Sequence, residues 1–239
     1  MVPHACRKGS KLSASEEEYL EAIYREQSKA KQRVKVSELA QKLKVKDPSV
    51  VEMLSRLSDK GLVTRDRSGA ALTDRGMDEA IRVVRRHKLA ERLLCDVFGH
   101  ELPGIHEHAC EFEHVFDDEL TEKIDELLKR PVTCPHGGII PRSRGNSEQP
   151  SLEPLSDLGC GEWGTVATIP EEKEAVERLL ALNILPGSKV MVTEKLPRGA
   201  IMLQCGKIQV ALSRDIASKI LVKRAAMRRV RRRAGRGWH

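Results

Sequence analysis

The sequence predicts a mainly helical chain with a small β domain near its C-terminal end. Apolar residues recur at helical spacing through residues 13–129. A segment rich in Pro, Ser and Gly follows at residues 141–158 without periodicity, so we expect a linker there. From residue 159 onward, short apolar runs separated by Gly and Pro turns indicate strands, with one inserted helix over residues 171–182.

The first 75 residues predict three helices followed by a hairpin. The first helix covers residues 13–27 and begins at Ser13, whose hydroxyl can cap it. The second covers residues 36–43 with Ser37 in a capping box, and the third begins at Asp47-Pro48 and ends at Gly61. Residues 62–73 then predict a two-stranded hairpin. This is the order of a winged helix-turn-helix, a DNA-binding fold, although a purely structural helical domain could share it.

Charge favours the DNA-binding interpretation. The formal net charge is +7, and residues 29–67 hold eleven Lys and Arg against five Asp and Glu. An excess of this kind suits the phosphate backbone of DNA. The N-terminal end of the third helix would enter the major groove, while basic residues around it would contact phosphates. The expected DNA-binding residues are Lys46, Pro48, Ser49, Val51, Glu52, Arg56, Arg65 and Arg67.

The middle of the chain is acidic and rich in side chains that bind metals. Residues 101–130 hold ten Asp and Glu against three Lys and Arg. Helices are expected over residues 74–98, 104–114 and 117–129. On the second of these, four donors fall within about 100° of arc at helical spacing, so one face presents imidazole, thiolate and carboxylate groups. These donors are His106, Cys110, Glu113 and His114.

Two further pairs of donors lie on neighbouring helices. His87 and Glu91 are i,i+4 neighbours on the helix of residues 74–98, and Glu18 and Glu21 are i,i+3 neighbours on the first helix. An exposed acidic helix with incidental histidines is the alternative, but the number of donors favours a metal site. Mixed oxygen and nitrogen donors with one sulfur favour Fe(II), Mn(II), Co(II) or Ni(II) over an all-thiolate zinc site, although Zn(II) should also bind in vitro.

The spacing of the cysteines and the hydropathy of the chain indicate where in the cell the protein resides. The six cysteines are dispersed without a CxxC pair, which indicates free thiols or metal ligands in a reducing environment. For Cys134 and His136 we favour a structural role in a turn, because no other donors flank them. No stretch approaches 18 uninterrupted apolar residues, and the N-terminus lacks an apolar signal core. We therefore expect a cytoplasmic protein with no membrane partner.

Several motifs resemble the diphtheria-toxin-repressor (DtxR-type) family of metal-dependent transcriptional regulators. Residues 18–24 (EYLEAIY), residues 87–94 (HKLAERLL), the spacing His-x3-Cys-x2-Glu-His-Val from residue 106 and residues 134–137 (CPHG) carry the resemblance. Residues 164–223 resemble the SH3-like, FeoA-type domain of many members. The resemblance implies an N-terminal winged helix-turn-helix, a helical dimerisation domain and a C-terminal SH3-like β-barrel. It also implies a homodimer that binds palindromic double-stranded operator DNA when its metal sites are filled.

The resemblance also implies two metal sites. One would consist of His87, Glu91, His106 and a residue near Glu172 of the SH3-like domain. The other would consist of Cys110, Glu113, His114 and Glu18, with Glu21 beside it. Iron-responsive members carry Met in place of Glu18, while manganese-responsive members carry the acidic pair and lack the Cys, so Fe(II) and Mn(II) both stay open. We expect the second site to be the switch, because it alone ties the first helix to the central helices.

The expected domain boundaries follow from these motifs. They are residues 1–75 for DNA binding, 76–140 for metal binding and dimerisation, 141–158 for the linker, 159–223 for the SH3-like domain and 224–239 for a basic tail. The tail is expected to add non-specific contact with nucleic acid, which also raises an RNA-associated protein as an alternative. Another alternative is a metalloenzyme with a hydrolytic site on the central helices, but no HExxH spacing is present. We therefore expect a repressor and not an enzyme.

Overall fold

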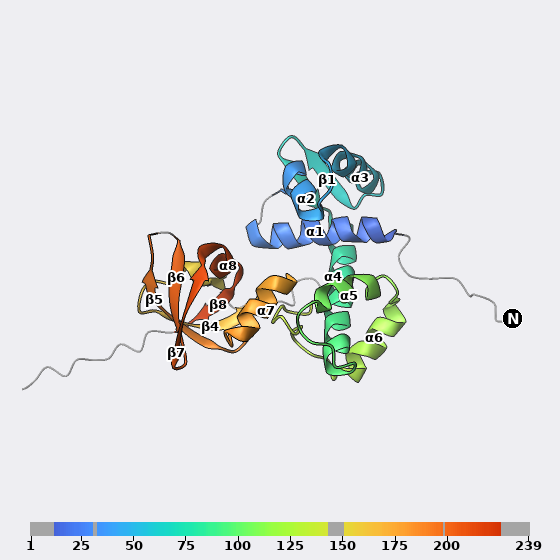
Figure 1. The fold of residues 1–239 in the computed structure, drawn as a ribbon. Helices are drawn as coiled ribbons and strands as arrows, with labels where there is room; N and C mark the ends of the chain where they lie inside the picture. Colours follow the sequence, from blue (N-terminus) through green and yellow to red (C-terminus); the bar gives the residue numbers. More distant parts are fainter. Residues whose placement is uncertain (1–11, 31–32, 143–150, 198, 226–239) are drawn as a thin grey trace, which may run out of the picture. The chain divides into compact units, whose positions relative to one another are not determined.

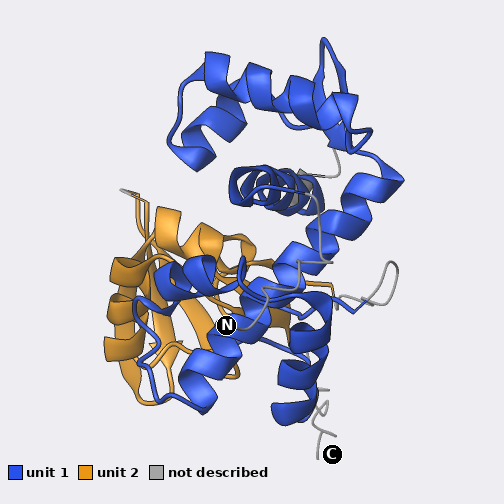
Figure 2. Ribbon diagram, turned by 90° about the vertical axis from the view of Figure 1, so that its right-hand side faces the viewer, with its two compact units in different colours: residues 1–148 blue, residues 149–239 orange. Residues whose placement is uncertain are grey.

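The computed structural model describes residues 12–30, 33–142, 151–197 and 199–225. Two compact units divide the chain, residues 1–148 and 149–239 (Figure 2). The first is helical with one hairpin, and the second contains a six-stranded sheet. The predicted fold class is therefore confirmed. The basic tail from residue 226 onward and residues 143–150 of the predicted linker lie outside the described residues.

The N-terminal domain follows the predicted order of elements. Helices α1 (Ala14–Ala30), α2 (Val36–Leu43) and α3 (Asp47–Asp59) precede the antiparallel strands β1 (Val63–Asp66) and β2 (Gly69–Leu72). Ser13 Oγ accepts from the amide of Glu16, and the Glu16 carboxylate accepts from the Ser13 amide, which makes a capping box at α1. The amide of Lys35, not Ser37, forms the equivalent bond at α2, because Lys35 is the N-cap and Ser37 already lies within the first turn of the helix.

Apolar side chains of all three helices fill the core of this domain. The buried residues recur at helical spacing along α1, and α2 and α3 supply the facing side chains. Val34 pairs with Ala70 and adds a bridge at the edge of the hairpin. Gly69 is required there, because its φ is +135° and a Cβ would lie 2.5 Å from the carbonyl oxygen of Val34. The hairpin is thus fixed against the helices.

Helix α4 (Asp74–Asp96) extends from beneath α1 to the region of α5 (Ile105–Phe112) and α6 (Asp118–Leu127) (Figure 1). Its N-cap is Thr73, whose side chain accepts from the amide of Gly76. Gly76 lets α4 pack against the hairpin, since a Cβ would lie 1.9 Å from the Leu62 carbonyl oxygen. Helix α5 ends two residues before the predicted end at His114. The last two donors of the predicted arc therefore lie at and beyond its C-terminus.

The second unit is built on one antiparallel sheet. Its strands are β3 (Glu153–Pro154), β4 (Trp163–Thr168), β5 (Lys189–Lys195), β6 (Ala200–Cys205), β7 (Ile208–Ser213) and β8 (Leu221–Arg224). They follow the order β3-β8-β4-β5-β6-β7, so the last strand returns to pair with the first two. Two helices accompany the sheet, the predicted α7 (Lys173–Ala181) and the short α8 (Arg214–Lys219). Only one helix was predicted, because six residues are too few for a helical period to be recognised.

Candidate metal centre and DNA-binding surface

His87 lies at the centre of the metal-binding side chains. The middle of α4 carries it, and the side chain is fully buried. Its Nδ1 lies 2.6 Å from Glu113 Oε2, and its Nε2 lies 3.1 Å from His106 Nδ1 and 3.3 Å from Glu91 Oε1. One imidazole therefore contacts donors from α4, from α5 and from the residue that caps α5.

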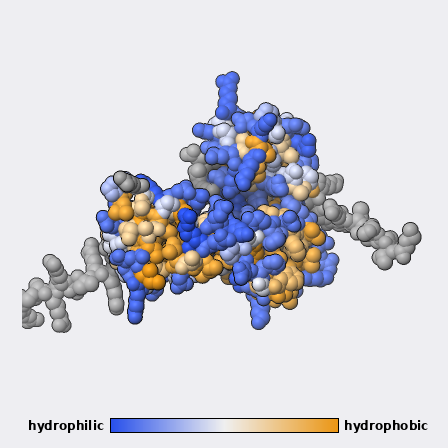
Figure 3. Space-filling view, viewed as in Figure 1, coloured by the Kyte–Doolittle hydropathy of each residue, from blue (hydrophilic) through white to orange (hydrophobic). Residues whose placement is uncertain are grey.

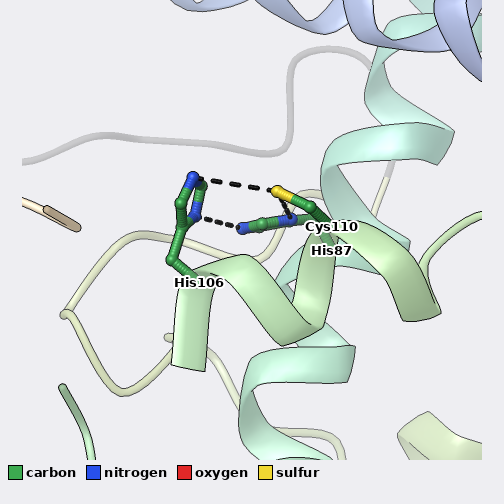
Figure 4. A group of neighbouring side chains, drawn as sticks. All are labelled: His87, His106 and Cys110. Atoms are coloured by element: carbon green, nitrogen blue, oxygen red, sulfur yellow. Dashed lines mark hydrogen bonds between the residues drawn. The ribbon is translucent and has the colours of Figure 1, made fainter. Parts of the chain in front are cut away.

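Cys110 completes a group of three donors on this side. Its Sγ lies 3.8 Å from His106 Nε2 and 4.0 Å from His87 Nδ1. Figure 4 shows the three side chains pointing toward one another, two from α5 and one from α4. Burial alone would raise the pKa of Cys110, but hydrogen bonds with His106 and His87 lower it. A lowered pKa favours the thiolate, the form in which cysteine binds a metal.

A second group joins α1 to α4 and α5. Ligand atoms of Glu21, His87 and Glu113 lie within 4.8 Å of one another, and all three residues are buried. Burial, together with the charge of Glu21, raises the pKa of Glu113 although His87 opposes this shift. Burial alone would lower the pKa of His87, but its bonds with Cys110 and Glu113 raise it well above its ordinary value. Both shifts favour the protonated forms of His87 and Glu113 in the metal-free protein, and a divalent cation would displace these protons on binding.

The first helix presents a different carboxylate from the one expected. Glu18 is exposed, and among the described residues no group of three donors includes it. Glu21 instead faces the cluster, held by a salt bridge of 2.7 Å to Arg25. His114 likewise stands outside these groups: its Nε2 is 3.5 Å from Glu113 Oε1, and its Nδ1 is 2.8 Å from Glu17 Oε2. The ligand roles of Glu18 and His114 stay predictions.

A third group was missed by the sequence analysis. Cys134 and His136 are buried beside Glu91, with ligand atoms within 4.8 Å of one another. We expected a structural role in a turn for this pair because no other donor flanks it in the sequence. In the structure Glu91, which lies 43 positions before Cys134 in the chain, supplies a third donor. Nothing local in the sequence signals this approach. The CPHG motif was the available sign, because a Cys and a His two positions apart at a turn can point the same way.

Polar atoms of this third group lack hydrogen bonds. His136 Nδ1 lies 3.1 Å from Glu91 Oε1, but neither atom completes a hydrogen bond, and the second oxygen of Glu91 and the other nitrogen of His136 have none either. Burial alone would raise the pKa of Glu91, but the imidazoles of His106 and His136 lower it well below its ordinary value. Buried carboxylate and imidazole atoms that lack hydrogen bonds are costly unless an ion satisfies them. These residues therefore fit a divalent cation.

Glu172 belongs to the second unit. It is exposed at the N-cap of α7, and its Oε1 lies 3.4 Å from Lys219 Nζ. Its role as a ligand stays a prediction.

The expected DNA-binding residues form one exposed surface on α3 and the hairpin. All eight are exposed, including the apolar Val51 at 48%. The Arg65 guanidinium donates to the Val51 carbonyl oxygen at 3.2 Å and to Ser55 Oγ at 3.5 Å. The first strand of the hairpin is thus tied to the exposed side of α3. An exposed apolar side chain among basic residues suits contact with a thymine methyl group.

Three family models match this chain in sequence. The N-terminal DNA binding domain of the iron dependent repressors matches residues 11–71, their metal binding and dimerisation domain matches residues 73–142, and the FeoA domain matches residues 153–224. The fold and the buried donors thus belong to a DNA-binding transcriptional regulator with a metal-binding dimerisation domain. The chain belongs to the diphtheria toxin repressor family of metal-dependent repressors.

Individual relatives agree with this assignment. The diphtheria toxin repressor of Corynebacterium efficiens is 30% identical over 199 residues, which cover 78% of this chain and 85% of the relative. The iron-dependent repressor IdeR of Mycobacterium tuberculosis is 29% identical over 202 residues, with 78% and 87% covered. A manganese-dependent transcriptional repressor in complex with manganese superposes with a TM-score of 0.82 at 28% identity, covering 88% of this chain and all of that one. ScaR with bound Cd2+ gives 0.76 at 27% identity, covering 88% and 99%.

No helix among the described residues has the length and apolar character needed to cross a membrane.

Proposed function

We propose that the protein is a repressor of metal-ion homeostasis genes, activated by Fe(II) or Mn(II), that binds palindromic operator DNA as a dimer. The observation that supports it most directly is the group formed by Glu21, His87 and Glu113. Glu21 belongs to the DNA-binding domain, while the other two belong to the metal-binding and dimerisation domain. A cation held by all three would fix one domain against the other.

The chain's own residues give this coupling a physical basis. Without a cation, the two buried carboxyl groups of Glu21 and Glu113 can stay close only where protons reduce their mutual repulsion. A bound cation would supply positive charge and coordination between them, with Glu18 and His114 as additional ligands. An ordered pair of winged domains matches two half-sites about one helical turn apart, so ordering raises DNA affinity. The two binding events are then linked.

Two ligand sets are proposed. The first is Glu21, His87 and Glu113, joined by Glu18 and His114, and it is the switch. The second is Glu91, Cys134 and His136, with His106 nearby at 3.9 Å from Glu91 Oε1, and it stabilises the dimerisation domain. Cys110, in contact with both His87 and His106, is a candidate for either set. Carboxylates favour Mn(II), and the thiols allow Fe(II), so both metals suit these donors.

The proposed dimer uses the exposed apolar surface of α5, α6 and the adjoining loops (Figure 3). Val115 is 73% exposed and Leu127 63% exposed, and Phe112 and Leu120 are also exposed. Ile105 and Ile124 of the same helices are instead buried in the core of their own unit. A patch of several large apolar side chains is typical of an interface between identical chains.

We propose regulation and not catalysis, because relatives of this chain are named repressors. Such a regulator would act in the cytoplasm, where it reaches chromosomal DNA. The basic tail would add non-specific contact with nucleic acid.

The proposal is tested on protein purified anaerobically. Elemental analysis identifies the bound metal, and binding to the DNA upstream of the protein's own gene is measured with that metal and with a chelator. We expect iron or manganese and DNA binding that requires it. Equal DNA binding in chelator would contradict the proposal.

A further inference from the structure

Glu17 is a buried carboxylate that none of the three donor groups uses. It lies on α1 next to Glu18, and only 5% of it is exposed. Its Oε1 accepts from Arg86 Nη2 at 2.8 Å, and its Oε2 lies 2.8 Å from His114 Nδ1. Arg86 also donates from Nη1 to the carbonyl oxygen of Phe116 at 3.0 Å. A chain of hydrogen bonds thus runs from α4 through α1 to the segment after α5.

The salt bridge between Arg86 and Glu17 fixes which nitrogen of His114 carries the hydrogen. Glu17 Oε1 lies 2.8 Å from the Arg86 guanidinium, so Glu17 pairs with this cation as a carboxylate. An ionised carboxylate only accepts hydrogen bonds, so Nδ1 of His114 must be the donor. In the neutral ring, Nε2 is then the nitrogen with a free lone pair. That nitrogen lies 3.5 Å from Glu113 Oε1, on the side of the metal-binding cluster.

The geometry points to Glu17 as a positioning residue: it holds His114 in the Nδ1–H tautomer and aims Nε2 at the cation that Glu113 would share. The inference rests on the proposed function, since it takes His114 to be a ligand. A carboxylate bonded to the far nitrogen of a histidine ligand fixes the ring and increases its basicity. Here that carboxylate comes from the DNA-binding domain, and Arg86 in turn fixes the carboxylate.

The tautomer is measured without metal. In the metal-free protein labelled with 15N and held at alkaline pH, two-bond proton–nitrogen correlation spectra distinguish the two neutral forms of His114. We expect the Nδ1–H form in the parent and a mixture of forms in Glu17→Ala. An Nε2–H form in the parent would overturn the inference, whatever the metal affinity.

Metal affinity is the second readout, with Mn(II) alone as the titrant in calorimetry. We expect Glu17→Gln to weaken about 10-fold the site that His114→Ala abolishes, because one amide oxygen cannot accept from both His114 and Arg86. Glu16→Gln is the matched control: Glu16 is also a buried carboxylate of α1, but it pairs with Lys60 at 2.7 Å, so its Mn(II) affinity should stay within twofold of the parent.

The outcomes distinguish failure of the inference about Glu17 from failure of the proposed metal site. If Glu17→Gln binds Mn(II) like the parent while His114→Ala does not, Glu17 has no positioning role and the proposed site stands. If His114→Ala itself binds Mn(II) like the parent, His114 is not a ligand, and that part of the proposed function fails with the inference. A Glu16→Gln protein as weak as Glu17→Gln would show a general effect of charge loss in α1 and would also overturn the inference.

Discussion

Removing the His87 imidazole should both destabilise the metal-free protein and abolish its response to metal. The ring is fully buried and contacts Glu91 and Glu113 at 3.3 and 2.6 Å, so His87→Ala leaves two buried carboxylates without this partner. Loss of one partner of a buried charged pair costs about 3–5 kcal/mol. The effect reaches the switch site, although the sequence placed His87 in the other site, because the structure also brings His87 against Glu113.

The loss of metal binding in His87→Ala can be expressed as a free energy of stabilisation. Metal at 100 times its dissociation constant stabilises the folded state by about 2.7 kcal/mol, and a 100-fold loss of affinity reduces this gain to about 0.4 kcal/mol. Urea unfolding with saturating Mn(II) and with chelator gives both quantities. His108→Ala is the control, since His108 is exposed on the same helix as His106. A His87→Ala protein that gains as much stability from Mn(II) as the parent would refute the reasoning.

Three further predictions concern the pH dependence of metal binding, the packing of α4 and the hairpin. The raised pKa of His87 stabilises the metal-free protein fully below the unfolded-state pKa of about 6.5, and this stabilisation is lost as the pH rises through the folded-state pKa. Because a metal binds only the neutral ring, the Mn(II)-induced rise in Tm should grow from about pH 6 to pH 8. A rise in Tm that does not change with pH would contradict this. Gly76→Ala should destabilise by about 3 kcal/mol or more in urea, because its Cβ would lie 1.9 Å from the Leu62 carbonyl oxygen, whereas an unchanged midpoint would mean that α4 shifts freely. Replacing Arg65 and Arg67 by Ala should lower the slope of log K against log salt by about two; an unchanged slope would place the hairpin away from the DNA backbone.

Local patterns were sufficient for the helices and for part of the metal centre. The i,i+4 spacing of His87 and Glu91 predicts two donors on one face of α4, and in the structure they are in contact and buried. The spacing of His106 and Cys110 on α5 similarly predicts two donors on one face. Both inferences need only the geometry of a single helix, which sequence spacing determines.

The other donors of the metal centre depend on tertiary packing, which local sequence patterns do not show. Which carboxylate of α1 faces the cluster depends on how the helix rotates against α4, and its buried face includes Glu17 and Glu21 but not Glu18. Those two are i,i+4 neighbours, a signal that could have been weighed against the i,i+3 pair. The approach of His136 to Glu91 joins segments 45 residues apart, which no local period reports.

The central claim is that a metal bound by both domains increases DNA affinity, and the most direct test compares the parent with His114→Ala on one operator fragment. Equilibrium binding is measured at saturating Mn(II) or Fe(II) under anaerobic conditions and again in chelator. The account predicts an increase of at least tenfold for the parent and almost none for His114→Ala. A variant that responds to metal like the parent, or a parent that binds equally well in chelator, would contradict it.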